Sequence, residues 1–144
     1  MSAANLPPST GLPGLDDVLK GLRLGDNIVM QVESIEDYLP FVTPYCEQAL
    51  REGRKLIYFR FARHEPLLPE DCGAEVVKLD PELGFEAFAS EIHRIIGEAG
   101  KGAYYLFDCL SDLAADWYSD LMLANFFMVT CPYLYELDTI TYFA

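Results

Sequence analysis

The sequence has few basic residues and no long hydrophobic run. Of its 144 residues only 10 are Lys or Arg, whereas 23 are Asp or Glu, so the formal net charge is −13. A surface this acidic repels nucleic acid and anionic lipid, and we expect neither as a partner. No apolar run approaches the roughly 20 residues of a membrane helix. Residues 1–10 also lack the basic and apolar regions of a signal peptide, so we expect a cytoplasmic protein.

Paired cysteines are absent as well. The sequence has four cysteines and no C-x-x-C pair. Without an export signal, they are expected to be reduced thiols that fill the core. Hydrophobic residues make up 51% of the chain and aromatic residues 13%. This composition predicts one well-filled domain over residues 11–144, preceded by a flexible lead-in over residues 1–10.

Short apolar segments alternate with amphipathic ones along the chain. The predicted strands are residues 27–32, 55–61, 74–79, 103–108 and 139–144. The predicted helices are residues 14–20, 35–52, 84–98 and 114–131. Strands that alternate with helices pair in parallel through right-handed crossovers. We therefore predict an α/β fold of three layers, α/β/α, around a mostly parallel five-stranded sheet.

Prolines and aromatic residues qualify the predicted helices. Pro40 and Pro44 should make the first turns of helix 35–52 irregular, and Pro132 should end helix 114–131. Six aromatic residues in the last third of the chain are expected to fill the core, with a partner-binding surface as the alternative. They are Trp117, Tyr118, Phe126, Phe127, Tyr133 and Tyr135.

Two segments together resemble the RecA/KaiC-like ATPases. Residues 9–16, Ser-Thr-Gly-Leu-Pro-Gly-Leu-Asp, are similar to the Thr-Gly-x-x-Gly-Leu-Asp motif that precedes the first core strand of that family. Residues 104–113 resemble its apolar strand that ends in Asp, here Asp108, and its Ser-Leu-Ser-like turn. The resemblance covers about 9–144 and implies a RecA-like P-loop NTPase core. It also implies the spatial strand order first, fifth, fourth, second, third, with strand 27–32 at an open edge.

The phosphate-binding loop of that family is missing. Such a loop needs glycines, whose amides curl around phosphate, and a Lys that reaches the outer phosphates. Its place holds Glu33-Ser34-Ile35-Glu36-Asp37-Tyr38-Leu39-Pro40, and there is no Gly, Lys or Arg between Asp26 and Ala49. The acids that follow the family's second strand are also replaced, by Arg63 and His64. We therefore expect a degenerate pseudo-ATPase with no catalytic residue and no bound cofactor.

Five residues are candidates for a vestigial nucleotide crevice at the carboxyl edge of the sheet, where open α/β sheets bind ligands. They are Ser34, Arg60, Arg63, His64 and Asp108. The basic members could hold an anion, or they could pair with Glu33, Glu36 and Asp37 across the crevice, and we expect the ion pairs.

Acidic residues recur every four positions at Asp108, Asp112, Asp116 and Asp120. One interpretation is a divalent metal site, with Asp108 and Asp112 as the candidate ligands. The other is a strand-end residue, a cap and solvated charges on a helix, where like charges at this spacing repel. The second interpretation is favoured, so no metal is expected.

A narrower resemblance concerns residues 21–29, 58–64 and 108–120, which look like the N-terminal region of bacterial proteins of the phosphoenolpyruvate synthase or pyruvate phosphate dikinase type. It implies a non-catalytic accessory, regulatory or interaction domain, an N-terminal fragment whose partners are its own C-terminal domains or another chain. The alternatives are a nucleotide-binding domain with an altered loop and an oligomerisation domain. Because strand 27–32 is apolar at Ile28, Met30 and Val32, a homodimer through its open edge is expected.

Overall fold

A single parallel sheet of five strands organises the protein. The structure, a computed structural model, describes residues 6–144. The strands are β1 (Asn27–Val29), β2 (Leu56–Arg60), β3 (Glu75–Lys78), β4 (Tyr104–Phe107) and β5 (Ile140–Phe143). All pair in parallel in the order β1-β5-β4-β2-β3, which confirms both the predicted parallel sheet and the predicted strand order.

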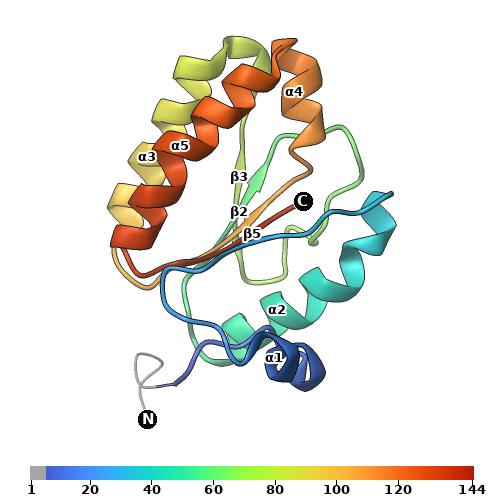
Figure 1. The fold of residues 1–144 in the computed structure, drawn as a ribbon, viewed down its shortest axis with the longest axis vertical. Coiled ribbons are helices and arrows are strands. Elements are labelled where there is room, and N and C mark those ends of the chain that lie inside the picture. The colour runs from blue at the N-terminus through green and yellow to red at the C-terminus, as the bar shows by residue number, and fades with distance from the viewer. Residues whose placement is uncertain (1–5) are drawn as a thin grey trace.

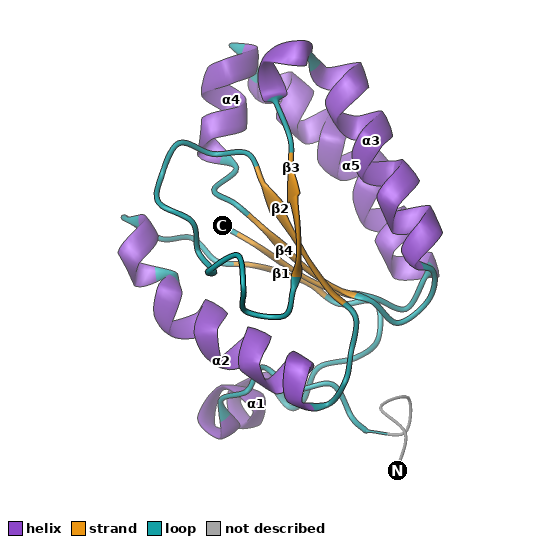
Figure 2. Ribbon diagram, turned by 180° about the vertical axis from the view of Figure 1, so that it is seen from behind, coloured by secondary structure: helices purple, strands orange, loops and turns teal. Residues whose placement is uncertain are grey.

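Helices cover both faces of this sheet, so the predicted three layers are confirmed (Figures 1 and 2). The helices are α1 (Pro13–Leu19), α2 (Leu39–Arg51), α3 (Phe85–Ala99), α4 (Ser111–Trp117) and α5 (Asp120–Glu136), with the 3-10 turns η2 (Ile35–Asp37) and η3 (Pro81–Leu83). Helices α1 and α2 lie on one face, and α3, α4 and α5 lie on the other. Within residues 6–144, no helix is both long enough and apolar enough to cross a bilayer.

The alternation of side chains along the strands divides the core between the two faces. Phe59, Phe107 and Phe143 pack in the cluster that α3 and α5 cover. Tyr104 and Tyr142 pack in the cluster with α2. On the α2 side, the ring of Tyr45 stacks on Tyr142 at a centroid separation of 3.8 Å, and its hydroxyl donates to the carbonyls of Tyr105 and Ile140. A tyrosine thereby ties α2 to the two central strands.

The N-terminal motif, residues 9–16, folds around the side chain of Asp16, and we call it the clasp. The carboxylate of Asp16 accepts hydrogen bonds from the Ser9 hydroxyl (2.5 Å), the Thr10 hydroxyl (2.6 Å) and the Thr10 amide (2.8 Å). Thr10 is fully buried, and Arg54 donates to the carbonyl of Leu6. The predicted lead-in is therefore wrong at Leu6 and Thr10, which are fixed against the domain, while residues 1–5 lie outside the described part of the chain.

These hydrogen bonds make the clasp sensitive to acid. Burial opposes ionisation of Asp16, but the bonds from Ser9 and Thr10 outweigh it and lower the pKa of its carboxyl. A depressed pKa contributes stability above the unfolded value, near 3.9, and that stability is lost as the pH falls through the folded value. We expect Asp16→Asn to lower the free energy of unfolding at pH 7, and the deficit to shrink below pH of about 4. Urea unfolding of both proteins across this range measures it, and a constant deficit would contradict it.

One predicted helix is in fact two. In place of a helix over 114–131, α4 ends at Trp117, Tyr118 adopts a left-handed φ of 51°, and Ser119 caps α5 by accepting from the Met122 amide. Pro132 does not end the helix but lies inside α5. Because Pro132 and Met128 are exposed, water can solvate the carbonyl that the proline leaves without an amide donor.

The segment after β1 is irregular, as the prolines predicted. Residues 35–37 form η2, and α2 then begins at Leu39 with Pro40 in its first turn and Pro44 inside it. Strand β1 is shorter than the predicted 27–32 and ends at Val29, although the Met30 amide still donates to the carbonyl of Phe143. The chain therefore leaves the sheet early, at the place where RecA/KaiC-like ATPases would carry their phosphate loop.

Candidate functional site

The carboxyl end of β4 carries a buried carboxylate that the chain's own donors surround. Asp108 is 0% exposed and follows directly after Phe107. One carboxylate oxygen, Oδ2, accepts from Arg60 Nη1 (2.8 Å), the Phe61 amide (2.8 Å) and the Ala62 amide (2.9 Å). The other, Oδ1, accepts from the Tyr58 hydroxyl. We call Asp108, Tyr58 and Arg60 the Asp108 hub.

The hub holds the loop that follows β2. The Arg60 guanidinium donates to the carbonyls of Ala62 and His64, and the Tyr58 hydroxyl accepts from the Leu67 amide at 3.1 Å. The crossover from β2 to β3 contains no helix, so this loop covers the sheet at that place. The hub therefore fixes a loop that could not satisfy its backbone groups by helical hydrogen bonds.

Charge is concentrated in the hub with little solvent to screen it. The side chain of Arg60 is 17% exposed and pairs with Asp108. Burial disfavours the Arg60 cation, but the hydrogen bond and charge of Asp108 outweigh burial and raise the pKa of Arg60. Burial, followed by the hydrogen bond and charge of Asp108, raises the pKa of Tyr58 well above its usual value. Tyr58 is thus a neutral phenol that donates to a carboxylate.

His64 lies beside the hub. Its Nε2 accepts from the Cys109 amide at 3.3 Å, and its Nδ1 lies 2.8 Å from the carbonyl of Glu65. A proton on Nδ1 fits these partners, because a carbonyl can only accept and an amide can only donate. Nε2 is also 3.7 Å from Asp108 Oδ1.

The four aspartates spaced by four residues diverge. Asp108 is in the hub, whereas Asp112 accepts from the Arg63 amide at 3.0 Å and Asp116 pairs with the Arg63 guanidinium. Asp120 begins α5. Nowhere in residues 6–144 do three or more His, Cys, Asp or Glu side chains gather as metal ligands. The pattern is a strand end followed by helix positions, because α4 begins between Asp108 and Asp112.

Arg60 and Arg63 form ion pairs, but their partners differ from those expected. Arg60 pairs with Asp108 and Arg63 with Asp116, rather than with Glu33, Glu36 or Asp37. The prediction placed the basic residues opposite the acids after β1. Instead, the loop after β2 lies beside the carboxyl end of β4 and beside α4, so Asp108, which follows β4, and Asp116 of α4 are the nearer acids.

The segment after β1 forms hydrogen bonds within itself. Ser34 and Asp37 form a capping box on η2, in which the Ser34 amide donates to Asp37 Oδ2 at 3.3 Å. Tyr38 then packs fully buried among the tyrosines on the α2 face, and its hydroxyl has no hydrogen-bond partner within residues 6–144. Burial raises the pKa of Tyr38 well above its usual value. An aromatic ring therefore fills the space behind the acidic turn.

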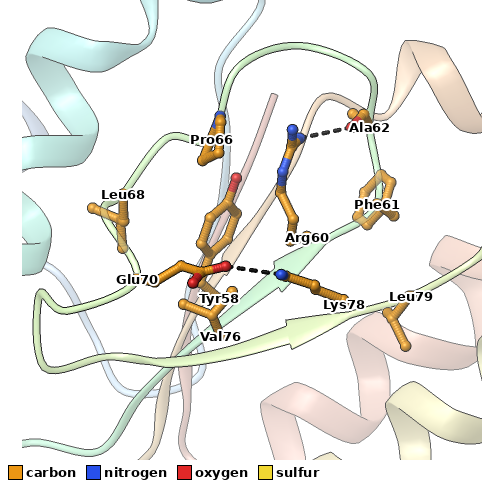
Figure 3. A pocket seen from close by; sticks show the side chains of 10 residues that line it. All are labelled: Tyr58, Arg60, Phe61, Ala62, Pro66, Leu68, Glu70, Val76, Lys78 and Leu79. Atoms are coloured by element: carbon orange, nitrogen blue, oxygen red, sulfur yellow. Dashed lines mark hydrogen bonds and ion pairs between the residues drawn. The ribbon is translucent and has the colours of Figure 1, made fainter.

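A cavity of about 390 Å³ opens beside the hub, over the ends of β2 and β3 (Figure 3). Much of its lining is apolar, and Tyr58 and Arg60 of the hub also line it. The ion pair between Lys78 Nζ and Glu70 Oε1, at 2.8 Å, lies across it, with both side chains 73% exposed. Of the five candidate residues only Arg60 lines this cavity; Ser34, Arg63, His64 and Asp108 do not.

The structure brings together three of the five residues predicted at this edge of the sheet, Arg60, His64 and Asp108. Tyr58 was not predicted there. The signal for Tyr58 was present, because it stands two residues before Arg60 in a parallel strand and so points to the same face. Lys78 and Glu70 carry no such signal, since their meeting depends on how the loop between β2 and β3 folds. Ser34 stays apart from the hub, in its own cap.

Comparison with protein-family models and with curated proteins finds no match to this sequence. The fold and the site therefore define the class. The protein is a parallel α/β/α domain whose strand-end Asp108 is bound by side-chain and backbone donors of the strand and loop beside it.

Proposed function

We propose that this chain is a non-catalytic interaction domain built on a RecA-like plan, a pseudo-ATPase that neither binds nor hydrolyses ATP. The observation that carries the proposal is that both carboxylate oxygens of Asp108 already accept hydrogen bonds from the protein. A metal-side Asp must offer free oxygen lone pairs to Mg²⁺. Asp108 instead accepts from a phenol, a guanidinium and two backbone amides, and it has no exposed surface.

The surroundings of the hub support the same proposal. Arg60 is held by Asp108 and two carbonyls, so it is not free to bind a phosphate. The turn after β1 carries carboxylates where a phosphate would need donors. At about 4 Å, each like-charge contact there would cost several kcal/mol in a site of effective dielectric near 20.

The rival function is nucleotide binding through an altered loop. It would rely on Arg63, whose side chain is 72% exposed, for the phosphate contact. Calorimetry of the chain with ATP and Mg²⁺ separates the two functions. We expect no heat of binding at nucleotide concentrations up to about 1 mM, a limit set by the weakest affinity the method resolves.

A matched pair of variants makes this result specific. Arg63→Ala and Arg94→Ala each remove an arginine that is more than half exposed and forms an ion pair. Arg63 pairs with Asp116, whereas Arg94 lies on α3 and pairs with Glu91 and Glu98. Micromolar ATP binding that Arg63→Ala abolishes and Arg94→Ala preserves would contradict the non-catalytic proposal. Binding that both variants preserve would contradict it too, and would place the nucleotide elsewhere.

We also propose that the domain serves a larger phosphotransferase of the phosphoenolpyruvate synthase type, as an accessory or regulatory module. The support is the resemblance of residues 21–29, 58–64 and 108–120. The reading frame that encodes the chain tests this directly. Downstream ATP-grasp and phosphohistidine domains would support the proposal, and a stop codon directly after Ala144 would refute it.

A further inference from the structure

An apolar stripe runs along α5. Between Asp120 and Glu136 this helix contains no charged residue. Leu121, Met128 and Tyr135 follow one another at intervals of seven residues, which places them on one side of a helix. Their exposed fractions are 69%, 72% and 67%. The prediction that Tyr135 fills the core is therefore wrong, as it is for Tyr118, which is 94% exposed.

The stripe lies on the side of α5 that faces away from α3. The opposite side of α5 lies against α3, where His93 bonds to Thr130 at 3.0 Å and stacks on Tyr133 (Figure 1). The stripe is about half a helical turn away from these contacts. At its lower end, a Cβ on Gly25 would come 2.8 Å from Tyr135 Cδ2, so the stripe meets the chain just before β1.

Strand β1 continues this surface. Ile28 and Met30 pack on the α2 face, so Val29 between them lies on the face of α5, where it is 62% exposed. Leu24, just before the strand, is 49% exposed. Strand β1 pairs with β5 on one side, and no strand within residues 6–144 pairs with its other side. We call Leu24, Val29 and the α5 stripe the β1–α5 surface.

We propose that the β1–α5 surface is the contact between two copies of this chain. In this dimer β1 pairs antiparallel with β1 of the second copy, which joins the two sheets, and the two α5 stripes face each other above the paired strands. The inference rests on the proposed interaction role and names the partner. The predicted edge 27–32 is part of the surface, and α5 is the part that the sequence did not indicate.

The size of the surface fits a dimer. Its five side chains expose on the order of 600 Å² of apolar area, which is the upper end of what a monomer usually leaves uncovered. A specific interface buries roughly 800 Å² on each partner. The main-chain groups of two paired β1 strands and the rim residues supply the remainder, so the surface is large enough without any other element.

Symmetry favours a second copy over another protein. An edge strand set antiparallel to itself satisfies the outward amides and carbonyls of both copies. The centre of the surface is uncharged, so two chains of net charge −13 bring no like charges together there. Two copies that each carry a net charge of −13 nevertheless repel one another as whole molecules. Salt screens that repulsion over a Debye length of about 8 Å or less.

Sedimentation equilibrium of the full chain from about 1 to 100 µM tests the proposal, a range in which weak dimers of this area dissociate. We expect a monomer–dimer equilibrium whose affinity rises from low salt to about 0.5 M salt. A partner with a basic rim would instead bind more weakly as salt rises. A chain that stays monomeric at about 100 µM in both salts overturns the proposal and leaves such a partner as the occupant.

Three variants locate the contact. Met128→Arg and Val29→Arg place charges in the centre of the surface and should weaken the dimer at least about tenfold. Leu83→Arg makes the same kind of change at a side chain that is 73% exposed next to α3, and should leave the affinity unchanged. Thermal unfolding midpoints that are unchanged at about 1 µM, where the dimer is dissociated, show that the variants are folded. A dimer that Leu83→Arg weakens as much as Met128→Arg overturns the proposal.

The two proposals can fail separately. ATP calorimetry on the same samples reports on the non-catalytic role, whereas sedimentation reports on the contact. A monomer that binds no ATP refutes the dimer alone. A dimer that binds ATP refutes the non-catalytic role and leaves the contact in place.

Discussion

Asp108→Asn is expected to destabilise the protein by about 3 to 5 kcal/mol, which is roughly 10 °C in the midpoint of thermal unfolding. The amide keeps the shape of the side chain but removes the charge that faces Arg60, and Arg60 is only 17% exposed. An NH₂ group must also replace one oxygen that now accepts, either from Tyr58 or from Arg60 and the two loop amides. Leaving buried donors without an acceptor costs their full desolvation energy.

An exposed acid provides the control for this change. Glu98→Gln makes the same replacement in an ion pair with Arg94, where both side chains are more than half exposed, and should cost less than about 1 kcal/mol. Urea unfolding of the three proteins at pH 7 measures the difference. If Asp108→Asn were as stable as Glu98→Gln, the carboxylate would have no structural role and would be available for a ligand.

Gly11→Ala is expected to have the second large effect, a loss of about 3 kcal/mol or more. Gly11 has φ +81°, a left-handed conformation that costs a side chain about 1 kcal/mol or more. A Cβ there would also overlap the backbone carbonyl of Pro44 in α2, which cannot move without disturbing the helix. The clasp around Asp16 lies against α2 through this close approach of Gly11 to Pro44.

Gly21→Ala separates the two causes. Gly21 has φ +85°, nearly the same conformation, but a Cβ there meets nothing within 4 Å. It should lose only the conformational cost of about 1 kcal/mol. Equal losses for Gly11→Ala and Gly21→Ala would show that the approach to Pro44 contributes nothing. Denaturant unfolding with a common slope for all three proteins is the measurement.

In this structure the strand-end acid Asp108 stabilises a loop. The resemblance to RecA/KaiC-like ATPases implies a metal-side role for Asp108. In this fold the same position anchors the crossover from β2 to β3, which has no helix to satisfy its backbone. We expect the loss of Asp108 to be detected by unfolding rather than by any assay of nucleotide turnover.

Local chemistry determined most of the fold. The alternation of apolar segments and amphipathic ones predicted five strands, and the parallel pairing followed from the helices between them. The strand order came from the resemblance of residues 9–16 and 104–113 and is confirmed. The sequence also indicated that Arg60, His64 and Asp108 meet, because the carboxyl ends of parallel strands lie at one edge.

Tertiary structure decided what local patterns leave open. Whether Pro132 ends α5 depends on its exposure, since a solvated carbonyl tolerates the missing donor. Whether Arg63 pairs with Glu33 or with Asp116 depends on the path of a loop, which has no periodicity to read. Whether Tyr135 is core or surface depends on which side of α5 the sheet covers. An almost uncharged helix looks buried on every side in sequence, but α5 lies in an outer layer of the fold, so one of its sides faces solvent.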